Sequence, residues 1–591
     1  MPRVLEAATI VLFLFFLAVV WFQQEKIKFF ISRNERSNHS AASDASSSRA
    51  NFYNLLPARE DHGKCKSRFE QHRYGKRDWE YVPSEYLIDR LRSYEEFHAR
   101  CTRGNSQTWF NSSTATENND CKFILWLDNS GLGNKMVSIA ATFLYALLTR
   151  RVLLIDPAED MEALFCEPFP RSSWFAPRDV PLEFLRSDEF RISFDKCHPG
   201  TAKFARHAYI EIMNGYDSIG DKFFCEKQQQ NISDQFPWLT ITTNLYFVPS
   251  LYYVPSFRTE LDKLFPRQEA AVFQHLVKYL FHPSNAAWDR ATRFYDTYMA
   301  GSSKLVGVQM RVLPNFQDLS RRAQSFSDAM VQCLLQSKLL PDVSVASNSS
   351  ASGKIIGVVV ASLDGQYFDG LREIYVSSPT VDGSLVRVFA PSKERWQQTN
   401  DRNHDEKALA DMLLLSFCAE LVTSPGSTFG YAAQGLGGVK PWLLNEKNCS
   451  KLDSTEPCFH AKVFYGCNCD SSSEAKSVQN NARSCPDVPW GLQTSPFQKT
   501  GRVIHDISLV WLVFLGEAPL FAEIQDIYSE GKQDSEISVK HHDNQYPKLF
   551  SILDCISNCI PNGKTRGGRQ MAMVAGTQVV EITELVFPGV S

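Results

Sequence analysis

The chain of 591 residues lacks several short patterns that mark common ligand sites. It contains no Asp-x-Asp pair, so the usual carboxylate arrangement for holding Mg or Mn is missing. Met136 stands where a dinucleotide fingerprint beginning at Gly131 needs its third glycine, and Asn558 stands where a P-loop around Gly563 needs its first. The formal net charge is only -4, which gives a nucleic-acid partner no support.

What the chain does have is the composition of a folded protein. Hydrophobic residues make up 43% and charged residues 22%, which excludes a disordered chain. A length of 591 residues exceeds what one ordinary core accommodates. We therefore expect two or more domains.

One uncharged hydrophobic run, Ala7–Phe22, lies near the N-terminus. It approaches the roughly 20 residues that span a bilayer core. A cleaved signal peptide is the competing interpretation, but bulky Trp21 and Phe22 stand where small residues should mark the cleavage site. A core helix would show a polar face, which is missing. The sequence thus predicts a cytosolic tail (1–6), a transmembrane signal anchor (7–22) and a stem rich in Ser and Asn (23–54).

Two signals disagree about which side of the membrane the body occupies. Lys26, Lys28 and Arg33 follow the run and only Arg3 precedes it, so the positive-inside rule alone predicts a cytosolic body. Fifteen cysteines and the Asn-x-Ser/Thr glycosylation sites favour the secretory lumen instead. These sites are Asn38, Asn111, Asn231, Asn348 and Asn448. We expect a single-pass type II protein with a lumenal body.

A cluster of cysteines near the end of the second half predicts disulfides. Its members are Cys449, Cys458, Cys467, Cys469 and Cys485. A zinc site is the alternative. The cluster holds no Cys-x-x-Cys pair, and this absence weakens the zinc interpretation. Because the total count is odd, at least one cysteine is unpaired or bonded to another chain.

The pattern of hydrophobic runs predicts an α/β protein. A strand at Cys121–Asp128, a helix at 138–150 and a strand at 152–156 form a βαβ unit, which implies a parallel sheet. A second series follows: strands at Ser303–Val312 and Lys354–Leu363, a helix at His404–Cys418 and a strand at 419–424. We expect an N-terminal domain at 55–300 and a C-terminal domain at 301–490 that face a cleft. The tail at 491–591 is assigned no role.

Two glycine-rich turns are candidate phosphate sites. Gly131, Gly133, Asn134 and Lys135 lie between a predicted strand and helix, where N–H groups could meet a phosphate. A tight turn that needs positive φ explains the same glycines equally well. In the second turn, Ser427 or Thr428 can cap a helix whose first N–H groups suit a pyrophosphate. A plain packed helix is the alternative there.

Arg311 favours the phosphate interpretation of the second turn. It ends one predicted strand, Thr423 ends another, and ligands of open α/β sheets lie beyond such strand ends. A guanidinium there can stabilise charge on a departing diphosphate, although a salt bridge to a nearby carboxylate is the alternative.

Several of these segments resemble the plant xyloglucan fucosyltransferase family, glycosyltransferase family 37. They are GLGNKMVSIAATFLYALLTRRVLLID, YFVPSLYYVPSF, LVGVQMRVL, HDEKALADMLLLS, TSPGSTFGYAAQGLGGVKPWLL and CPDVPWGL, in the family's order between about Leu55 and Leu492. The resemblance implies a Golgi membrane enzyme of variant GT-B fold with two Rossmann-like domains. It also implies inverting transfer of L-fucose from GDP-fucose to the 2-hydroxyl of a galactosyl residue, without a metal cofactor.

The resemblance also implies which residues bind the donor. They are Gln309, Arg311, Ser424, Ser427, Thr428, Phe429, Gly430 and Tyr431, with Arg311 stabilising the leaving group. The acceptor would be a galactosylated cell-wall polysaccharide, such as xyloglucan, or an arabinogalactan protein. A homodimer is one option for the assembly.

The chain departs from the family pattern on the acceptor side. Asn244-Leu245 stands where the family has Asp-Asn, which removes a carboxylate that could orient or deprotonate the acceptor. The base is therefore unassigned, and Asn244 and Tyr246 are acceptor-side candidates. A non-catalytic member that binds glycan or nucleotide in a Golgi assembly is the alternative function.

Overall fold

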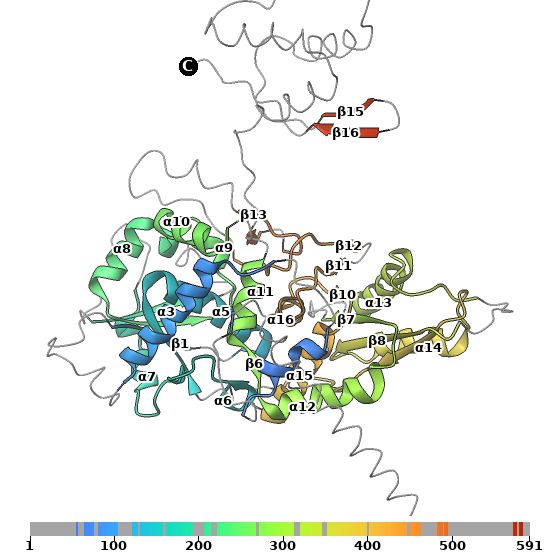
Figure 1. The fold of residues 1–591 in the computed structure, drawn as a ribbon, viewed down its shortest axis with the longest axis horizontal. Helices are drawn as coiled ribbons and strands as arrows, with labels where there is room; N and C mark the ends of the chain where they lie inside the picture. The colour runs from blue at the N-terminus through green and yellow to red at the C-terminus, as the bar shows by residue number, and fades with distance from the viewer. Residues whose placement is uncertain are drawn as a thin grey trace, which may run out of the picture. The chain divides into compact units, whose positions relative to one another are not determined.

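The computed structural model forms two compact units, Met1–Gln498 and Lys499–Ser591. It describes residues 55–56, 64–75, 81–103, 121–127, 130–157, 161–192, 206–213, 222–266, 271–311, 319–344, 352–398, 401–445, 449–461, 482–488, 490–494, 571–575 and 578–582. In the second unit, β15 (Met571–Ala575) and β16 (Gln578–Ile582) pair as an antiparallel hairpin. All other elements belong to the first unit (Figure 1).

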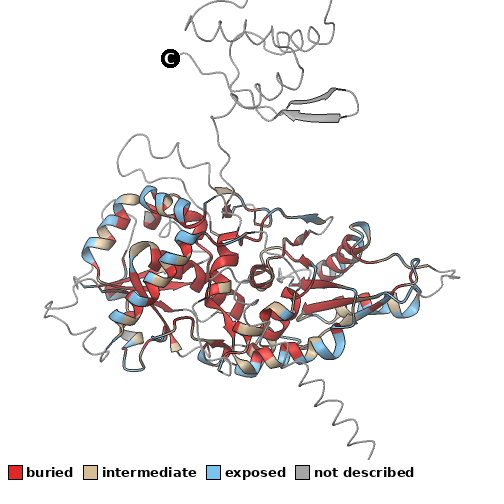
Figure 2. Ribbon diagram, in the orientation of Figure 1, coloured by how far each residue is buried: buried red, intermediate tan, exposed pale blue. Residues whose placement is uncertain are grey.

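The first sheet of the larger unit is parallel and has the strand order β2-β1-β5-β4. Its strands are β1 (Lys122–Leu127), β2 (Arg151–Ile155), β4 (His207–Ile212) and β5 (Trp238–Thr243). These segments are nearly continuous runs of buried residues, as expected for strands covered on both faces (Figure 2). Helix α5 (Leu132–Thr149) joins β1 to β2, which confirms the predicted βαβ unit.

Besides these strands and α5, the chain before β7 forms one long helix and several shorter ones. They are α2 (Ser67–Glu70), η1 (Gln71–Arg73), α3 (Glu85–Cys101), α6 (Met161–Leu164), α7 (Leu182–Leu185), η3 (Asp188–Phe190), η4 (Lys222–Phe224), α8 (Glu226–Gln235), α9 (Val248–Leu251), α10 (Pro255–Leu264), α11 (Val272–Leu280), α12 (Asn285–Phe294) and the π-helix η6 (Tyr295–Met299). A small antiparallel pair, β3 (Phe165–Cys166) and β6 (His282–Pro283), lies outside the main sheet. Helix α3 begins where the Ser84 hydroxyl accepts a hydrogen bond from Leu87 N.

The second sheet has the strand order β12-β11-β10-β7-β8-β9. Its strands are β7 (Lys304–Met310), β8 (Ile355–Ser362), β9 (Leu385–Phe389), β10 (Glu420–Thr423), β11 (Trp442–Leu444) and β12 (Cys449–Lys451). All pairs are parallel except β11 with β12. The associated helices are α13 (Leu319–Gln336), α14 (Gln366–Ser377), α15 (Arg402–Ser416) and α16 (Thr428–Gly437). The predicted α/β class with parallel sheets is confirmed.

Helix α5 is the one helix in the described ranges that is long and apolar enough to cross a membrane. Nearly all of its side chains are buried, and it packs against α11 and α16. It is therefore a core helix. The predicted anchor at 7–22 and the stem at 23–54 lie outside the described residues.

Disulfides join Cys65 to Cys166, Cys101 to Cys121, Cys333 to Cys449 and Cys458 to Cys485. The prediction of a bond inside the C-terminal cluster is thus right for Cys458 and Cys485. It is wrong for Cys449, because α13, which carries Cys333, packs over the sheet edge where β12 begins. Cys467 and Cys469 lie outside the described residues, and Cys418 is a buried thiol.

A hairpin of β13 (Ala482–Ser484) and β14 (Leu492–Thr494) ends the described part of the larger unit. All three residues of β14 are buried. The sequence placed a domain boundary between residues 490 and 491, which would cut through this hairpin. The compact unit that contains this hairpin extends to Gln498.

Candidate functional site

The candidate site lies where the order of the second sheet reverses. From β7 the chain builds outward through β8 and β9, and then returns to place β10 on the other side of β7. Gln309 of β7 pairs with Thr423 of β10. In open α/β sheets, ligands bind beyond the carboxyl ends of the strands at such a switch point. Arg311 and the turn after Thr423 therefore occupy the expected position.

Two hydrogen bonds tie these strand ends together. Ser424 N donates to Gln309 O at 3.0 Å, and Arg311 N donates to the Ser424 hydroxyl at 2.9 Å. Ser424 and Gln309 are both buried. The backbone of Arg311 is thus held by contacts that do not involve its guanidinium.

Helix α16 begins directly above these two strand ends. A Cβ added to Gly430 would lie 2.9 Å from Gln309 Oε1 and 3.2 Å from Thr423 Cγ2. Both distances are shorter than ordinary contacts, so a larger residue at position 430 would displace the side chains of Gln309 and Thr423. Helix α16 ends at Gly438, whose φ of 62° lies in the left-handed region that glycine adopts readily.

The N-terminus of α16 has an unsatisfied hydroxyl. Ser427 occupies the N-cap position with an extended backbone, but its side chain does not make the predicted capping hydrogen bond. Its Oγ is buried and has no hydrogen-bond partner among the described residues. The first turn also contains no acidic residue, and its N–H groups have no intrahelical partners. An anion at this end of α16 would satisfy both the hydroxyl and the helix.

The N-terminus of α5 meets that of α16. A Cβ on Gly133 would lie 2.7 Å from Phe429 N and 2.8 Å from Thr428 C. The Thr428 hydroxyl donates to Asn134 Oδ1 across the same contact. The alternative that these glycines serve a turn with positive φ is wrong, because φ at Gly131 is −68° and Gly133 is helical. Gly133 is needed for close approach of the two helices.

The Arg311 side chain links this contact to a loop between β9 and α15. Its Nη2 donates to Gln397 Oε1 at 2.9 Å. A Cβ on Gly131 would lie 2.8 Å from Gln397 Nε2, so Gln397 lies against the start of α5 as well. No sequence pattern marks Gln397, and it was not among the predicted site residues.

Arg311 keeps its charge and has no carboxylate partner in the described part of the chain. Partial burial lowers the pKa of its guanidinium, but arginine starts so far above neutrality that it stays protonated. Within the described ranges Arg311 makes no salt bridge, so the alternative of a structural ion pair has no support. Its charge is available to a ligand.

The acceptor-side candidates differ from each other. Asn244 Oδ1 is buried without a partner in the described part of the chain. Tyr246 is fully buried, and its hydroxyl donates to Glu456 Oε2 at 2.7 Å. Glu456 also accepts from Phe273 N at 2.7 Å, and burial raises its pKa to about 8. Tyr246 therefore holds the segment after β5, while the Asn244 amide remains open to a further contact.

Lys135, which the sequence placed in the first glycine-rich turn, is buried in the first turn of α5.

Comparison with known proteins gives consistent results. A family model described as xyloglucan fucosyltransferase matches residues 25–468. A galactoside 2-alpha-L-fucosyltransferase of Arabidopsis thaliana is 39% identical over 463 residues, covering 74% of this chain and 82% of that protein. One of the same name from Pisum sativum is 40% identical over 460 residues, covering 73% of this chain and 80% of its own.

A solved structure also resembles the fold. It is Arabidopsis thaliana FUT1, an arginine-to-lysine mutant in complex with GDP, at 37% sequence identity and a TM-score of 0.67. The match covers 75% of this chain and 99% of that one.

Proposed function

This chain belongs to the xyloglucan fucosyltransferase family, and on that premise we propose that it transfers L-fucose from GDP-fucose to a galactosyl residue of a cell-wall glycan. The fucose joins the 2-hydroxyl, with inversion, on a xyloglucan or arabinogalactan side chain. The observation that carries the proposal is the Ser427 hydroxyl at the start of α16, which has no partner among the described residues, together with Arg311, whose backbone is bonded to Ser424 in the turn before that helix. The GDP complex of the FUT1 relative supports the same donor.

In the proposed reaction the acceptor oxygen attacks C1 of fucose while the bond from C1 to the phosphate oxygen breaks. The electron pair leaves with GDP, and the proton of the acceptor hydroxyl is released to solvent. Arg311 and the N–H groups at the start of α16 would stabilise the charge that develops on the diphosphate. Together they would stabilise the negative charge of the leaving diphosphate, as a metal cation does in metal-dependent enzymes. No metal is proposed here. An amide such as Asn244 can orient the acceptor hydroxyl but cannot take its proton, so no base is assigned.

We extend the proposal to the architecture. The two sheets would form the two Rossmann-like domains of a variant GT-B fold that face a cleft. Residues 55–300 would then face the acceptor, and residues from 301 through β14 would bind GDP-fucose. The parallel pairing of all strands in these two sheets except β11 with β12, and the position of Arg311 at a switch point, support this division.

We expect the purified chain from residue 55 onward to transfer fucose from GDP-fucose to one class of galactosylated acceptor. Xyloglucan and arabinogalactan acceptors would be tested separately, and transfer would be followed by mass of the product. A product linked elsewhere than at the galactosyl 2-hydroxyl would contradict the proposed regiochemistry. Firm GDP binding without turnover on any acceptor would favour the alternative of a non-catalytic family member.

We also propose that the enzyme is a type II protein of the Golgi membrane with its body in the lumen. Disulfides such as Cys65–Cys166 and Cys333–Cys449 suit an oxidising compartment. Asn231 lies within α8 and is partly buried, so a glycan there would have to be added before that helix packs. We expect endoglycosidase treatment of the full chain made in a secretory host to increase its gel mobility. Unchanged mobility would count against the lumenal assignment.

A further inference from the structure

The carboxylate of Asp487 is bonded both to the turn before α16 and to α16 itself. Asp487 Oδ2 accepts a hydrogen bond from Gly426 N at 2.8 Å and from the Tyr431 hydroxyl at 2.5 Å. Gly426 lies in the turn before the helix and has φ of 64°, while Tyr431 lies inside α16. The turn and the helix are therefore fixed relative to each other through a single oxygen atom.

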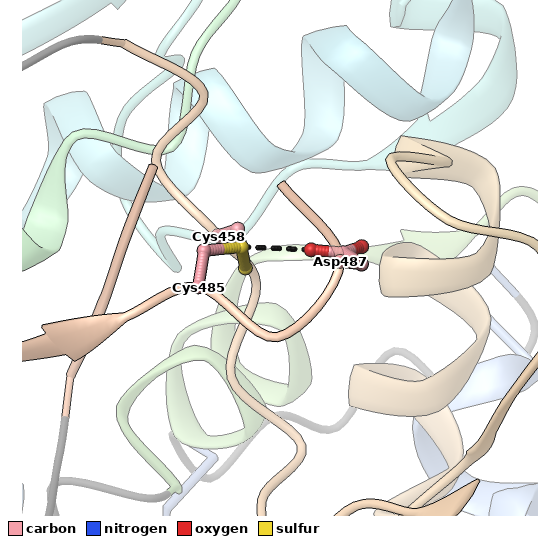
Figure 3. A group of neighbouring side chains, drawn as sticks. All are labelled: Cys458, Cys485 and Asp487. Atoms are coloured by element: carbon pink, nitrogen blue, oxygen red, sulfur yellow. Dashed lines mark hydrogen bonds between the residues drawn. A yellow bond between two sulfur atoms is a disulfide. The ribbon is translucent and has the colours of Figure 1, made fainter. Parts of the chain in front are cut away.

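A disulfide holds that carboxylate in place. Cys485, two residues before Asp487, forms a disulfide with Cys458 (Figure 3). Cys458 in turn is two residues before His460. The dashed line in Figure 3 joins Asp487 Oδ1 to Cys485 Sγ at 2.7 Å. Because this sulfur belongs to the disulfide, it has no proton to donate, and the approach is a close contact. The paired sulfurs are not thiolates either, so these three side chains do not form a zinc site.

His460 completes the network from the other side of Tyr431. Its Nε2 lies 2.9 Å from the Tyr431 hydroxyl. An ionised carboxylate can only accept, so the single hydroxyl proton of Tyr431 goes to Asp487. Nε2 of His460 must then carry a proton and donate to the Tyr431 oxygen. Burial lowers the pKa of His460, which keeps the ring neutral at neutral pH.

We propose that Asp487, clamped by the Cys458–Cys485 disulfide, is a positioning residue for the nucleoside-diphosphate site at the start of α16. The inference rests on the proposed function, because it assumes that this helix end receives the diphosphate of the donor. The Gly426 N–H donates its hydrogen bond to Asp487. The N–H groups that remain for the ligand therefore begin at Ser427. It also fixes the direction in which those groups point. Precise orientation of donors is what gives such a site its affinity.

The test compares variants of Asp487 by GDP titration calorimetry and by kinetics. We expect Asp487→Ala to weaken GDP binding about tenfold and to raise KM for GDP-fucose, while KM for the acceptor stays unchanged. Asp487→Asn should recover part of the affinity, since its amide oxygen can still accept from Gly426 N. A merely structural role would lower the melting temperature but leave the Kd of the folded protein unchanged.

The chain offers a matched control in the segment that carries Cys458. Asp453 pairs with Arg483 at an exposed position, and Asp453→Asn should leave GDP affinity unchanged. Because Asp487→Ala could fail to fold, Tyr431→Phe is the second variant. It removes the Tyr431 bonds to Asp487 and His460 but keeps the bond from Gly426 N to Asp487, and we expect about threefold weaker GDP binding.

The outcomes separate this inference from the proposed function. Wild-type GDP affinity in folded Asp487→Ala, or in Tyr431→Phe if Asp487→Ala does not fold, would overturn the clamp alone. A wild-type chain that binds no GDP would overturn the proposed function and the clamp with it. Weaker GDP binding after substitution of both Cys458 and Cys485 by serine, in a protein that stays folded, would support the disulfide's part in the clamp.

Discussion

Replacing Arg311 with alanine should lower the rate of fucose transfer about 100-fold while the protein remains folded. The loss of one charge-assisted contact that strengthens in the transition state costs about 3 kcal/mol. The fold should tolerate the change, because Ser424 holds the Arg311 backbone and the side chain contacts only Gln397 among the described hydrogen-bond partners. Initial rates and GDP titration would measure the effect.

Two further measurements test whether Arg311 stabilises the leaving diphosphate in place of a metal ion. Arg311→Lys keeps the charge but loses the planar fork, so it should restore only part of the rate. The wild-type enzyme should be insensitive to EDTA. Arg372, exposed on α14, provides the control, and Arg372→Ala should leave the rate unchanged. Full activity in Arg311→Ala, or wild-type activity that EDTA abolishes and Mn restores, would contradict this mechanism.

Replacing Gly133 with alanine should damage both stability and donor binding. The new Cβ would lie 2.7 Å from Phe429 N and 2.8 Å from Thr428 C, which are backbone atoms and cannot turn aside. The starts of α5 and α16 must then separate, at a cost of about 1–3 kcal/mol. A shift on the order of 1 Å in the donor site can lower the rate by about 100-fold. Melting curves, GDP titration and initial rates would measure these effects.

Gly370 provides the matched control for this substitution. It lies in α14, and the nearest atom to an added Cβ is Ser327 Oγ at 3.8 Å, an ordinary contact. Gly370→Ala should therefore be neutral or stabilising by up to about 1 kcal/mol, since alanine favours the helix. If Gly133→Ala had the melting temperature and the GDP affinity of the wild type, Gly133 would not be required for the close approach of the two helices.

The strands and the position of Arg311 could be predicted because both depend on local patterns. Continuous apolar runs predict buried parallel strands, and parallel strands end at one edge of the sheet. Arg311 and Ser424, 113 residues apart, therefore had to come close, and they form a hydrogen bond. The end of α16 at Gly438 follows from the same local logic.

The remaining parts of the site depend on contacts that no local pattern encodes. Gln397 and Asp487 belong to loops far from the site in the sequence. No pattern around either residue predicts that Gln397 contacts Arg311 or that Asp487 contacts Gly426. Gly133 shows a second limit, because a glycine needed for close approach and one needed for positive φ look the same in a sequence. The Cys333–Cys449 bond was missed because it required knowing that α13 covers the edge of the second sheet.

The order of the disulfides along the chain has a consequence for synthesis. Cys101–Cys121 lies inside the loop closed by Cys65–Cys166, and all four of these cysteines precede Cys333 in the sequence. The Cys333–Cys449 and Cys458–Cys485 bonds follow one after the other without crossing. None of these four bonds joins the part that forms the first sheet to the part that forms the second. A chain that emerges N-terminus first can therefore oxidise the first half while the ribosome is still making the second.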